Sequence, residues 1–199
     1  MGELNSKAYH SGKAEADNSA TPWWILRQVC DVANVIVSCD MAATVKTAKA
    51  DCFFTKEDDA LSHSWADAYS ENQFFANNVL YINPPFSMAR EFTEKAVKGN
   101  VPVLGCVKYA PDTAWFQDNV EDGANYIYVP DGRIDFVDED GELLHRIKDG
   151  KKIYGGANFP VCFPLWLPYN NGGEAQRVRF KRDKQKYQTP EESKLERQK

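Results

Sequence analysis

The stretch Val79-Leu80-Tyr81-Ile82-Asn83-Pro84-Pro85-Phe86 joins a short apolar run to a proline-rich turn. A continuous apolar run of this length is typical of a strand buried on both faces of a parallel sheet. Ligands of open α/β sheets bind beyond the carboxyl ends of such strands, so we expect Asn83 to face a binding crevice. The paired prolines restrict the backbone and offer no N–H donor, which predicts a rigid loop.

The segments around this stretch alternate between strand and helix patterns. Thr21-Pro22 opens an apolar helix over 23–32, with Thr21 as the N-cap and Pro22 at the first helical position. Strands are also predicted at 35–39, 101–107 and 126–129, and helices at 88–98 and 112–120. This order predicts an α/β fold in which a mixed, mostly parallel sheet is flanked by helices.

Beyond Gly132 the pattern changes to short apolar runs separated by Asp/Gly turns. These turns predict a small β-hairpin region over about 135–155. The run 159–167 is apolar but contains prolines, so we expect a strand near a sheet edge, where a missing N–H costs little. The chain is thereby divided into a flexible arm (1–19), a main domain (20–173) and a basic, flexible tail (174–199).

The composition is that of a globular protein. The 199 residues are 43% hydrophobic, 13% aromatic and 27% charged, which excludes collagen-like, disulfide-scaffold and wholly disordered classes. No run approaches the roughly 18 to 20 apolar residues that span a bilayer, so we expect no membrane partner and a cytoplasmic protein. The five scattered cysteines have no CxxC spacing and the three histidines are dispersed, which predicts reduced, buried thiols and no metal site.

Charge is distributed unevenly along the chain. Residues 174–199 carry nine Lys or Arg and five Asp or Glu, whereas the rest of the chain carries 15 basic and 24 acidic residues. A basic segment of this kind is either an ordinary solvated tail or a surface that follows a phosphate backbone. The charge pattern alone leaves both interpretations open.

The Asn83 loop suits the methylation of an exocyclic amine. The N6 amine of adenine is a poor nucleophile because its lone pair is delocalised into the ring. The Asn83 side-chain oxygen and the Pro84 carbonyl can accept the amino hydrogens and so localise that lone pair. Pro85 fixes the loop, and Phe86 offers a face on which a base can stack. An adenine within a duplex is inaccessible, so it must be flipped out to reach this loop.

Asn83-Pro84-Pro85-Phe86 resembles the amino-methyltransferase signature, in which Asn or Asp precedes two prolines and an aromatic residue. The wider chain, from about residue 21 to 167, is similar to the short DNA N-6-adenine methyltransferases of phages and prophages, the Dam-like group. In chain order, this resemblance is carried by residues 21–23, 39–43, 54–61, 83–87, 112–116, 132–136 and 156–160.

The resemblance implies a Rossmann-like, S-adenosylmethionine-dependent methyltransferase fold that acts on double-stranded DNA. It also implies GATC as the recognition sequence, the cytoplasm of a host bacterium as the location, and a monomer or weak dimer. Thr21-Pro22-Trp23 corresponds to the element that lines the methionine end of S-adenosylmethionine. Asp40 occupies the acidic position at the end of the first strand, where a carboxylate can pair with the cofactor's ammonium group.

Two further pairs of residues are implied in cofactor binding. Ala42 and Ala43 stand where many cofactor-binding folds have glycine for close backbone approach, so this chain departs from the general methyltransferase pattern. Asp58 and Asp59 are expected to hold the ribose hydroxyls or the adenine amine of the cofactor.

An enzyme that acts on DNA must neutralise phosphates. The candidates are Lys108, Arg133, Arg146, Lys151 and Lys152, for each of which ordinary surface charge is the alternative. The same loop chemistry also serves cytosine N4, RNA or protein glutamine as substrate. A non-catalytic nucleic-acid-binding protein that retains the fold is a further alternative.

Overall fold

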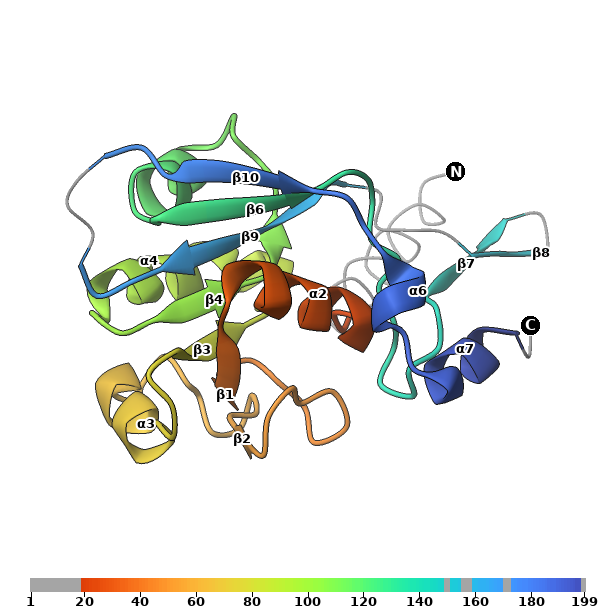
Figure 1. Cartoon of the computed structure of the whole chain (residues 1–199), viewed down its shortest axis with the longest axis horizontal. Coiled ribbons are helices and arrows are strands. Elements are labelled where there is room, and N and C mark those ends of the chain that lie inside the picture. Colours follow the sequence, from red (N-terminus) through yellow and green to blue (C-terminus); the bar gives the residue numbers. More distant parts are fainter. Residues whose placement is uncertain (1–18, 149–150, 155–158, 170–172, 198–199) are drawn as a thin grey trace, which may run out of the picture.

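A computed structural model describes residues 19–148, 151–154, 159–169 and 173–197 (Figure 1). An eight-stranded sheet has the order β10-β6-β9-β4-β3-β1-β2, and its short strand β5 pairs with β9. Its strands are β1 (Ile36–Asp40), β2 (Cys52–Phe53), β3 (Asn78–Ile82), β4 (Val103–Gly105), β5 (Val107–Lys108), β6 (Tyr126–Pro130), β9 (Val161–Trp166) and β10 (Gln176–Phe180). Only β9 runs antiparallel to its neighbours, so the predicted mixed, mostly parallel α/β sheet is confirmed.

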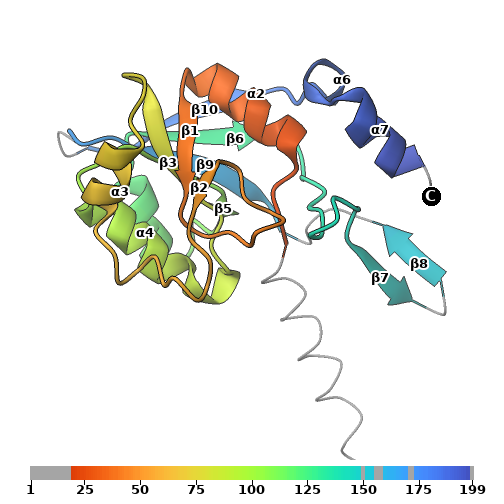
Figure 2. The same ribbon diagram turned by 90° about the horizontal axis from the view of Figure 1, so that it is seen from below.

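Helices cover both faces of this sheet. They are α2 (Trp23–Ala33), α3 (Trp65–Glu71), α4 (Ala89–Lys98), α5 (Ala114–Phe116), α6 (Lys184–Tyr187) and α7 (Pro190–Arg197), with a 3₁₀ turn at Phe86–Met88 and a π-helical turn at Gln117–Glu121. In Figure 2, α2 lies on one side of the sheet and α3 and α4 lie on the other.

Strand β3 shows why the fold needs both layers. Val79 and Tyr81 pack in one buried cluster with residues of α2, whereas Leu80 and Ile82 pack in the other cluster with residues of α3 and α4. Successive side chains of a strand point to opposite faces, so an unbroken apolar run requires cover on both sides. Every residue of β3 is buried.

The predicted N-cap of the first helix is wrong. Helix α2 begins at Trp23, Pro22 occupies the cap position, and no side chain caps the helix. The Thr21 hydroxyl instead accepts a hydrogen bond from the Tyr81 hydroxyl at 2.8 Å. Thr21 is fully buried, so its side chain ties the start of α2 to β3.

Strand β9 lies between β4 and β6, and not near a sheet edge as its prolines predict. It pairs with β4 through residues 165–166 and with β5 through residues 161–162. Pro164 lies between the residues that pair with β4 and those that pair with β5, and on the other side of the strand it is paired with Ile127 of β6.

Residues 174–199 do not form the flexible tail that their charge predicts. Residues 176–180 form β10, which pairs in parallel with β6 at the edge of the sheet. Phe180 is buried, while Arg177 and Arg179 are exposed. The charge run is thus the solvent-facing half of an alternating strand, and the sheet extends past the predicted domain boundary at residue 173.

The segment after β10 is held against α2 by hydrogen bonds and an ion pair. The buried Gln28 side chain donates to the Lys181 carbonyl at 2.8 Å and accepts from the Asp183 N–H at 2.9 Å. Arg27 pairs with Glu192 of α7 at 2.6 Å. Figure 1 shows α6 beside α2.

Two cysteines also depart from the prediction of reduced thiols. Cys39 and Cys52 occupy directly paired positions of β1 and β2 and form a disulfide. Their Cα atoms are 4.6 Å apart, within the range that disulfides bridge. Parallel pairing of two strands brings them together, and a sequence separation of 13 does not reveal it.

None of the helices in the described ranges has the length and hydropathy needed to cross a membrane.

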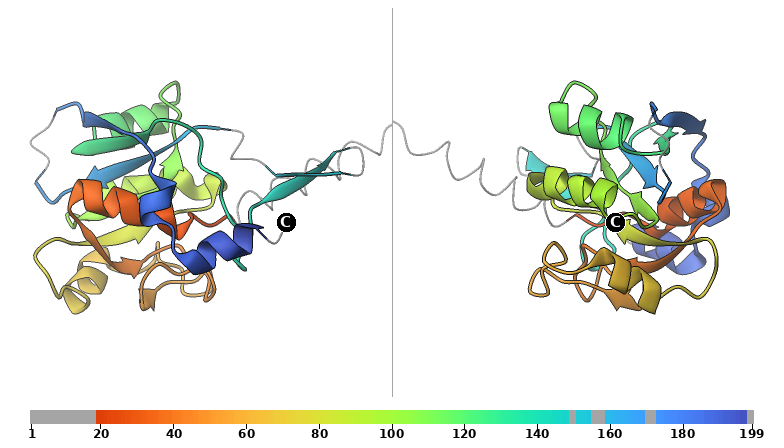
Figure 3. Two further views of the ribbon diagram at one scale, coloured as in Figure 1. Left: turned by 45° about the vertical axis from the view of Figure 1, so that its right-hand side comes forward. Right: turned by 90° about the vertical axis from the view of Figure 1, so that its left-hand side faces the viewer.

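The predicted hairpin region contains a separate two-stranded sheet. Strands β7 (His145–Lys148) and β8 (Lys151–Tyr154) are antiparallel and project from the body of the molecule (Figures 2 and 3). Val137 forms antiparallel bridges with Ala20 and with Leu143, so this region begins beside the start of α2. The predicted arm falls almost wholly on residues 1–18, outside the described residues.

The strand order places a crevice between β1 and β3. From the carboxyl end of β1 the chain continues to β2 on one side, while β3 flanks β1 on the other side. This is a topological switch point, where ligands of open α/β sheets bind. The loops that follow β1 and β3 carry Asp40 and Asn83.

Candidate active site

A cavity of about 320 Å³ lies at this switch point. Binding pockets for small molecules usually begin at about this volume. Of the residues predicted for catalysis or cofactor binding, those that line the cavity are Thr21, Asp40, Ala42, Ala43, Asp59, Asn83 and Pro85. The predicted residues Pro22, Trp23, Asp58, Pro84 and Phe86 are not part of its lining.

The Asn83 amide is held in one orientation. Its Nδ2 donates a hydrogen bond to the Ser19 carbonyl oxygen at 2.9 Å. This contact uses a donor of the amide, and Oδ1 remains available to accept a hydrogen bond. In the described part of the chain, no donor is paired with Oδ1. Asn83 thus presents the acceptor that polarisation of an amine requires.

The prolines after Asn83 are held by packing and by the following turn. Pro84 is buried, and Pro85 is the cap of the 3₁₀ turn at 86–88. The Pro85 carbonyl accepts the Met88 N–H at 2.8 Å. The loop therefore has little freedom to change the direction of the Pro84 carbonyl.

Phe86 lies in an aromatic cluster beside the cavity. Its ring centroid is 4.6 Å from that of Phe159 and 6.5 Å from that of Phe136, both in edge-on geometry. The Nζ of Lys108 lies 5.9 Å from the Phe159 ring centroid. The cluster fixes the Phe86 ring and places a cation close to it.

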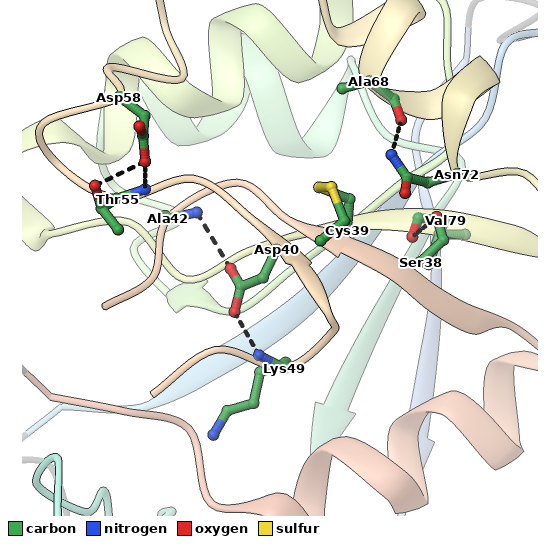
Figure 4. Close-up of a disulfide and its surroundings, with 11 residues drawn as sticks. Ser38, Cys39, Asp40, Ala42, Lys49, Thr55, Asp58, Ala68, Asn72 and Val79 are labelled. Atoms are coloured by element: carbon green, nitrogen blue, oxygen red, sulfur yellow. Dashed lines mark hydrogen bonds between the residues drawn. A yellow bond between two sulfur atoms is a disulfide. The ribbon is translucent and has the colours of Figure 1, made fainter. Parts of the chain in front are cut away.

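Asp40 organises the loop that follows β1. Its side chain is only 2% exposed, and its two oxygens accept the N–H groups of Ala42 at 3.2 Å and Lys49 at 3.0 Å (Figure 4). Burial raises the pKa of Asp40 to about 6, although both hydrogen bonds act to lower the pKa. The carboxylate therefore closes the loop between residues 42 and 49 and lies at the cavity wall.

The absence of glycine from this loop has a structural explanation. Among the described residues, the non-glycine residues with positive φ are Asn34, Asp59 and Asn100. Ala42 and Ala43 therefore adopt backbone conformations that suit any L-residue. Their small side chains still allow a ligand to approach the backbone.

Asp58 and Asp59, which were predicted to bind the cofactor as a pair, have different surroundings in the structure. Asp58 accepts hydrogen bonds from the Thr55 N–H at 2.8 Å and the Thr55 hydroxyl at 2.7 Å, which lower its pKa (Figure 4). Asp59 lines the cavity and has a φ of 49°. Asp58 thus stabilises the turn that brings Asp59 to the cavity.

The predicted DNA-binding residues lie on three different segments. Lys108 ends β5 and is exposed; Arg133 is also exposed, and its carbonyl accepts from Arg182. In the β7–β8 ladder, Arg146 is paired with Ile153, Ile147 with Lys152, and Lys148 with Lys151.

Several residues that line the cavity were not predicted as site residues from the sequence, and three of them are polar groups with a clear place in the structure: Ser19, Lys49 and Tyr81. Ser19 acts through its backbone carbonyl, which no side-chain pattern reveals. Tyr81 could have been recognised as the polar member of an apolar strand. Lys49 lies in a polar stretch that contains no motif, yet only 8% of it is exposed.

Fold and cavity together define a class, the amino-methyltransferases, because an Asn-Pro-Pro-aromatic loop and a buried carboxylate meet at the switch point of a mostly parallel sheet. The DNA N-6-adenine-methyltransferase (Dam) family matches residues 9–152, most of the chain. The chain belongs to this family and is an enzyme that uses S-adenosylmethionine as cofactor and DNA as substrate.

An individual relative agrees with this assignment. The chain is 27% identical over 135 residues to the DNA N-6-adenine-methyltransferase of Haemophilus phage HP1 (strain HP1c1). The aligned region covers 65% of this chain and 72% of that protein. No solved structure matches the chain.

Proposed function

We propose that this enzyme methylates the N6 atom of an adenine that is flipped out of duplex DNA, within the sequence GATC. The observation that carries this proposal is that Asn83 and Asp40, from neighbouring strands, line the same cavity. One residue supplies an acceptor for the base and the other supplies a carboxylate for the cofactor. The GATC sequence is supported by membership of the Dam family.

Asn83 and Pro84 act on the adenine amine. The Asn83 Oδ1 and the Pro84 carbonyl accept the two N6 hydrogens, which localises the nitrogen lone pair and stabilises the positive charge that develops on N6. S-adenosylmethionine supplies an activated methyl group on its sulfonium. The N6 lone pair would form the new N–C bond as the methyl–sulfur bond breaks, which leaves S-adenosylhomocysteine, and the extra proton on N6 would pass to solvent. Pro85 holds the loop, and Phe86 stacks against the base.

The remaining lining residues, together with Pro22, Trp23 and Asp58 next to them in the sequence, hold the cofactor. The buried Asp40 carboxylate pairs with its ammonium group, and Thr21-Pro22-Trp23 borders its methionine end. Ala42 and Ala43 allow it to approach the backbone, and Asp59 binds its ribose hydroxyls or adenine amine. Asp58 contributes by shaping the turn before Asp59.

Basic residues outside the cavity contact the DNA. Lys108 is closest to the flipped base, because it lies over Phe159, which packs on Phe86. Arg133 and the hairpin residues Arg146, Lys151 and Lys152 contact phosphates or base edges further along the duplex. We place the enzyme in the bacterial cytoplasm, where its substrate is found, as a monomer or weak dimer.

Digestion of DNA from cells that express the protein tests this function. DNA containing N6-methylated GATC should become resistant to a nuclease that cuts only unmethylated GATC, and sensitive to one that requires the methylated site. Expression of Asn83→Ala should leave both digestion patterns as in cells without the protein.

Transfer of labelled methyl groups to defined substrates separates the alternatives. Duplexes with GATC should accept label, and duplexes in which that adenine is replaced should not. Label found only on cytosine, RNA or protein glutamine would overturn the proposal. Label on adenine in another sequence would overturn the GATC recognition sequence but not adenine methylation.

A further inference from the structure

We propose that Lys49 binds the carboxylate of the methionine end of S-adenosylmethionine, while Asp40 binds its ammonium group. The inference rests on the proposed position of the cofactor and adds a residue to it. The loop after β1 would then recognise both charges of an amino-acid group.

Lys49 is a buried cation of the cavity wall, and its ammonium group has neither an ion-pair partner nor a hydrogen-bond partner among the described residues. It is 8% exposed and lines the cavity. Its backbone N–H is bound to Asp40, while its side chain extends away from that carboxylate (Figure 4). Throughout the described residues, no carboxylate lies within ion-pair distance of its Nζ, and no hydrogen bond from Nζ is found.

The groups around Nζ position it but do not neutralise it. Nζ lies 4.7 Å from the centroid of the Trp23 ring, a cation–π contact at the start of α2. The nearest charged residues of the helices are Arg27 and Glu192, which pair with each other at 2.6 Å. Lys49 is therefore held in place and remains available to an anion.

Two opposite charges on one cavity wall form a site for a zwitterion. A buried charge without a partner is costly, and burial lowers the pKa of Lys49 to about 8. Asp40 has the opposite charge and is also buried, and the hydrogen bonds of its carboxylate come from backbone N–H groups, so its only link to the Lys49 ammonium is attraction through space. A ligand that brings an ammonium and a carboxylate together would satisfy both residues, whereas a singly charged ligand would leave one of them unsatisfied.

Two neighbouring lysines provide matched controls. Lys46 belongs to the same loop but lies outside the cavity lining, and its Nζ pairs with Asp140 at 3.1 Å. Lys56 lines the cavity but is exposed. Methionine has a similar length to lysine and suits a buried position, so each lysine can be replaced by Met without a large change in volume.

Calorimetric titration with three ligands tests the assignment. S-adenosylhomocysteine carries both charges, its decarboxylated analogue keeps only the ammonium group, and 5′-methylthioadenosine carries neither. Lys49→Met should bind S-adenosylhomocysteine about 10- to 100-fold more weakly than the wild type, as expected for loss of a charge-assisted hydrogen bond. Its affinity for the other two ligands should change less than about threefold, and Lys46→Met should match the wild type for all three.

Several outcomes would overturn the inference. One is an equal loss of affinity for all three ligands in Lys49→Met, and another is a carboxylate-dependent loss in Lys56→Met instead. In both cases the wild type still binds S-adenosylhomocysteine, so the proposed function survives. Failure of the wild type to bind any of the three ligands would overturn the cofactor position itself.

Thermal unfolding provides a readout that does not depend on ligand. Ligand-free Lys49→Met should unfold at the same temperature as the wild type or higher, because it removes a buried charge that has no partner. A lower unfolding temperature would overturn the premise that the Lys49 ammonium has no stabilising partner in the ligand-free protein.

Discussion

The loops after β1 and β3 meet at the same cavity but are built differently. The loop after β3 is fixed by its own chemistry, through two prolines and a short turn closed by the Met88 N–H. The loop after β1 is fixed from within by the Asp40 carboxylate, which binds backbone groups at residues 42 and 49. One loop is stiff because of its covalent structure, and the other because of a buried charge.

This difference separates two tasks of a methyltransferase. Residues 83–86 contain no titratable side chain, so the acceptors they present to a base do not depend on pH. Asp40 and Lys49, which we propose bind the cofactor, are titratable and buried, so the charge on their side of the cavity depends on pH. We therefore expect mutations in the first loop to affect transfer and mutations in the second to affect cofactor binding.

The largest effect is expected from Asn83→Ala. Loss of a preorganised acceptor should lower the rate of methyl transfer by about 10²- to 10³-fold. Single-turnover transfer to a duplex measures the rate, and calorimetry with S-adenosylhomocysteine should give an affinity close to that of the wild type. Asn83→Asp keeps an acceptor oxygen and should retain part of the rate. An equal loss of rate and of cofactor affinity would contradict the separation of tasks.

Asp40→Asn is expected to have the next largest effect. Removal of the carboxylate charge should weaken S-adenosylhomocysteine binding by about 10- to 100-fold. The decarboxylated analogue should lose a similar factor, because it also carries the ammonium group. Asp58→Asn is the matched control, since Asp58 is exposed and bound to Thr55. A similar loss of affinity in both variants would argue against a direct role of Asp40.

A smaller effect is expected from pH alone. Asp40, with a pKa raised to about 6, is ionised above that pH, and Lys49, with a pKa lowered to about 8, is charged below that pH. Affinity for S-adenosylhomocysteine should be highest between about pH 6 and 8 and fall by up to about tenfold per pH unit outside this range.

Calorimetry across pH measures this profile and assigns its two limbs. Asp40→Asn should lack the acidic limb and Lys49→Met the basic limb. Other titratable groups nearby are Tyr81 and Cys106, whose pKa values are raised by burial, the paired Arg27 and Glu192, and the lining residues Lys56 and Asp59. A limb that persists in its variant would have to come from one of these groups or from the ligand.

The same titration has a consequence for stability in the ligand-free protein. The pKa of Asp40 is higher in the folded state than its ordinary value of 3.8, so protonation favours folding. Its contribution to the free energy of unfolding is therefore fully present below about pH 4 and is lost as the pH rises through about 6. Ligand binding should restore stability at neutral pH.

The smallest effect is expected from Lys108→Ala, which tests the DNA side of the Asn83 loop. Loss of one phosphate contact should raise the KM for DNA a few-fold and reduce the salt dependence of binding by about one unit of log–log slope. Cofactor affinity should not change. Lys98→Ala is a suitable control, because Lys98 pairs with Glu94 on α4. The same reduction in slope for both variants would show that Lys108 makes no specific phosphate contact.

Sequence reasoning succeeded where the chemistry is local. The buried strand before Asn83, the proline pair after it and the helix from Trp23 depend on neighbouring residues, and all lie where predicted. Asp40 was placed correctly at the end of β1, because strand ends are visible as the end of an apolar run.

Sequence reasoning failed where distant segments decide the structure. β10 resembles a charged tail because only one of its faces meets the core, and the interior position of β9 depends on its pairing with β4, β5 and β6, which are distant in the sequence. Lys49 lacks any local signal, since its burial comes from packing beside Trp23. Such features require the three-dimensional contacts themselves.

The bond between Cys39 and Cys52 makes the loop after β1 a closed ring. Asp40 and Lys49 both belong to this ring, so the disulfide limits how far the two residues can move apart. A cross-link that closes a loop of this size stabilises a protein by about 3 kcal/mol, mainly by restricting the unfolded chain. β2 contains only two residues, and the disulfide joins one of them to its directly paired residue in β1.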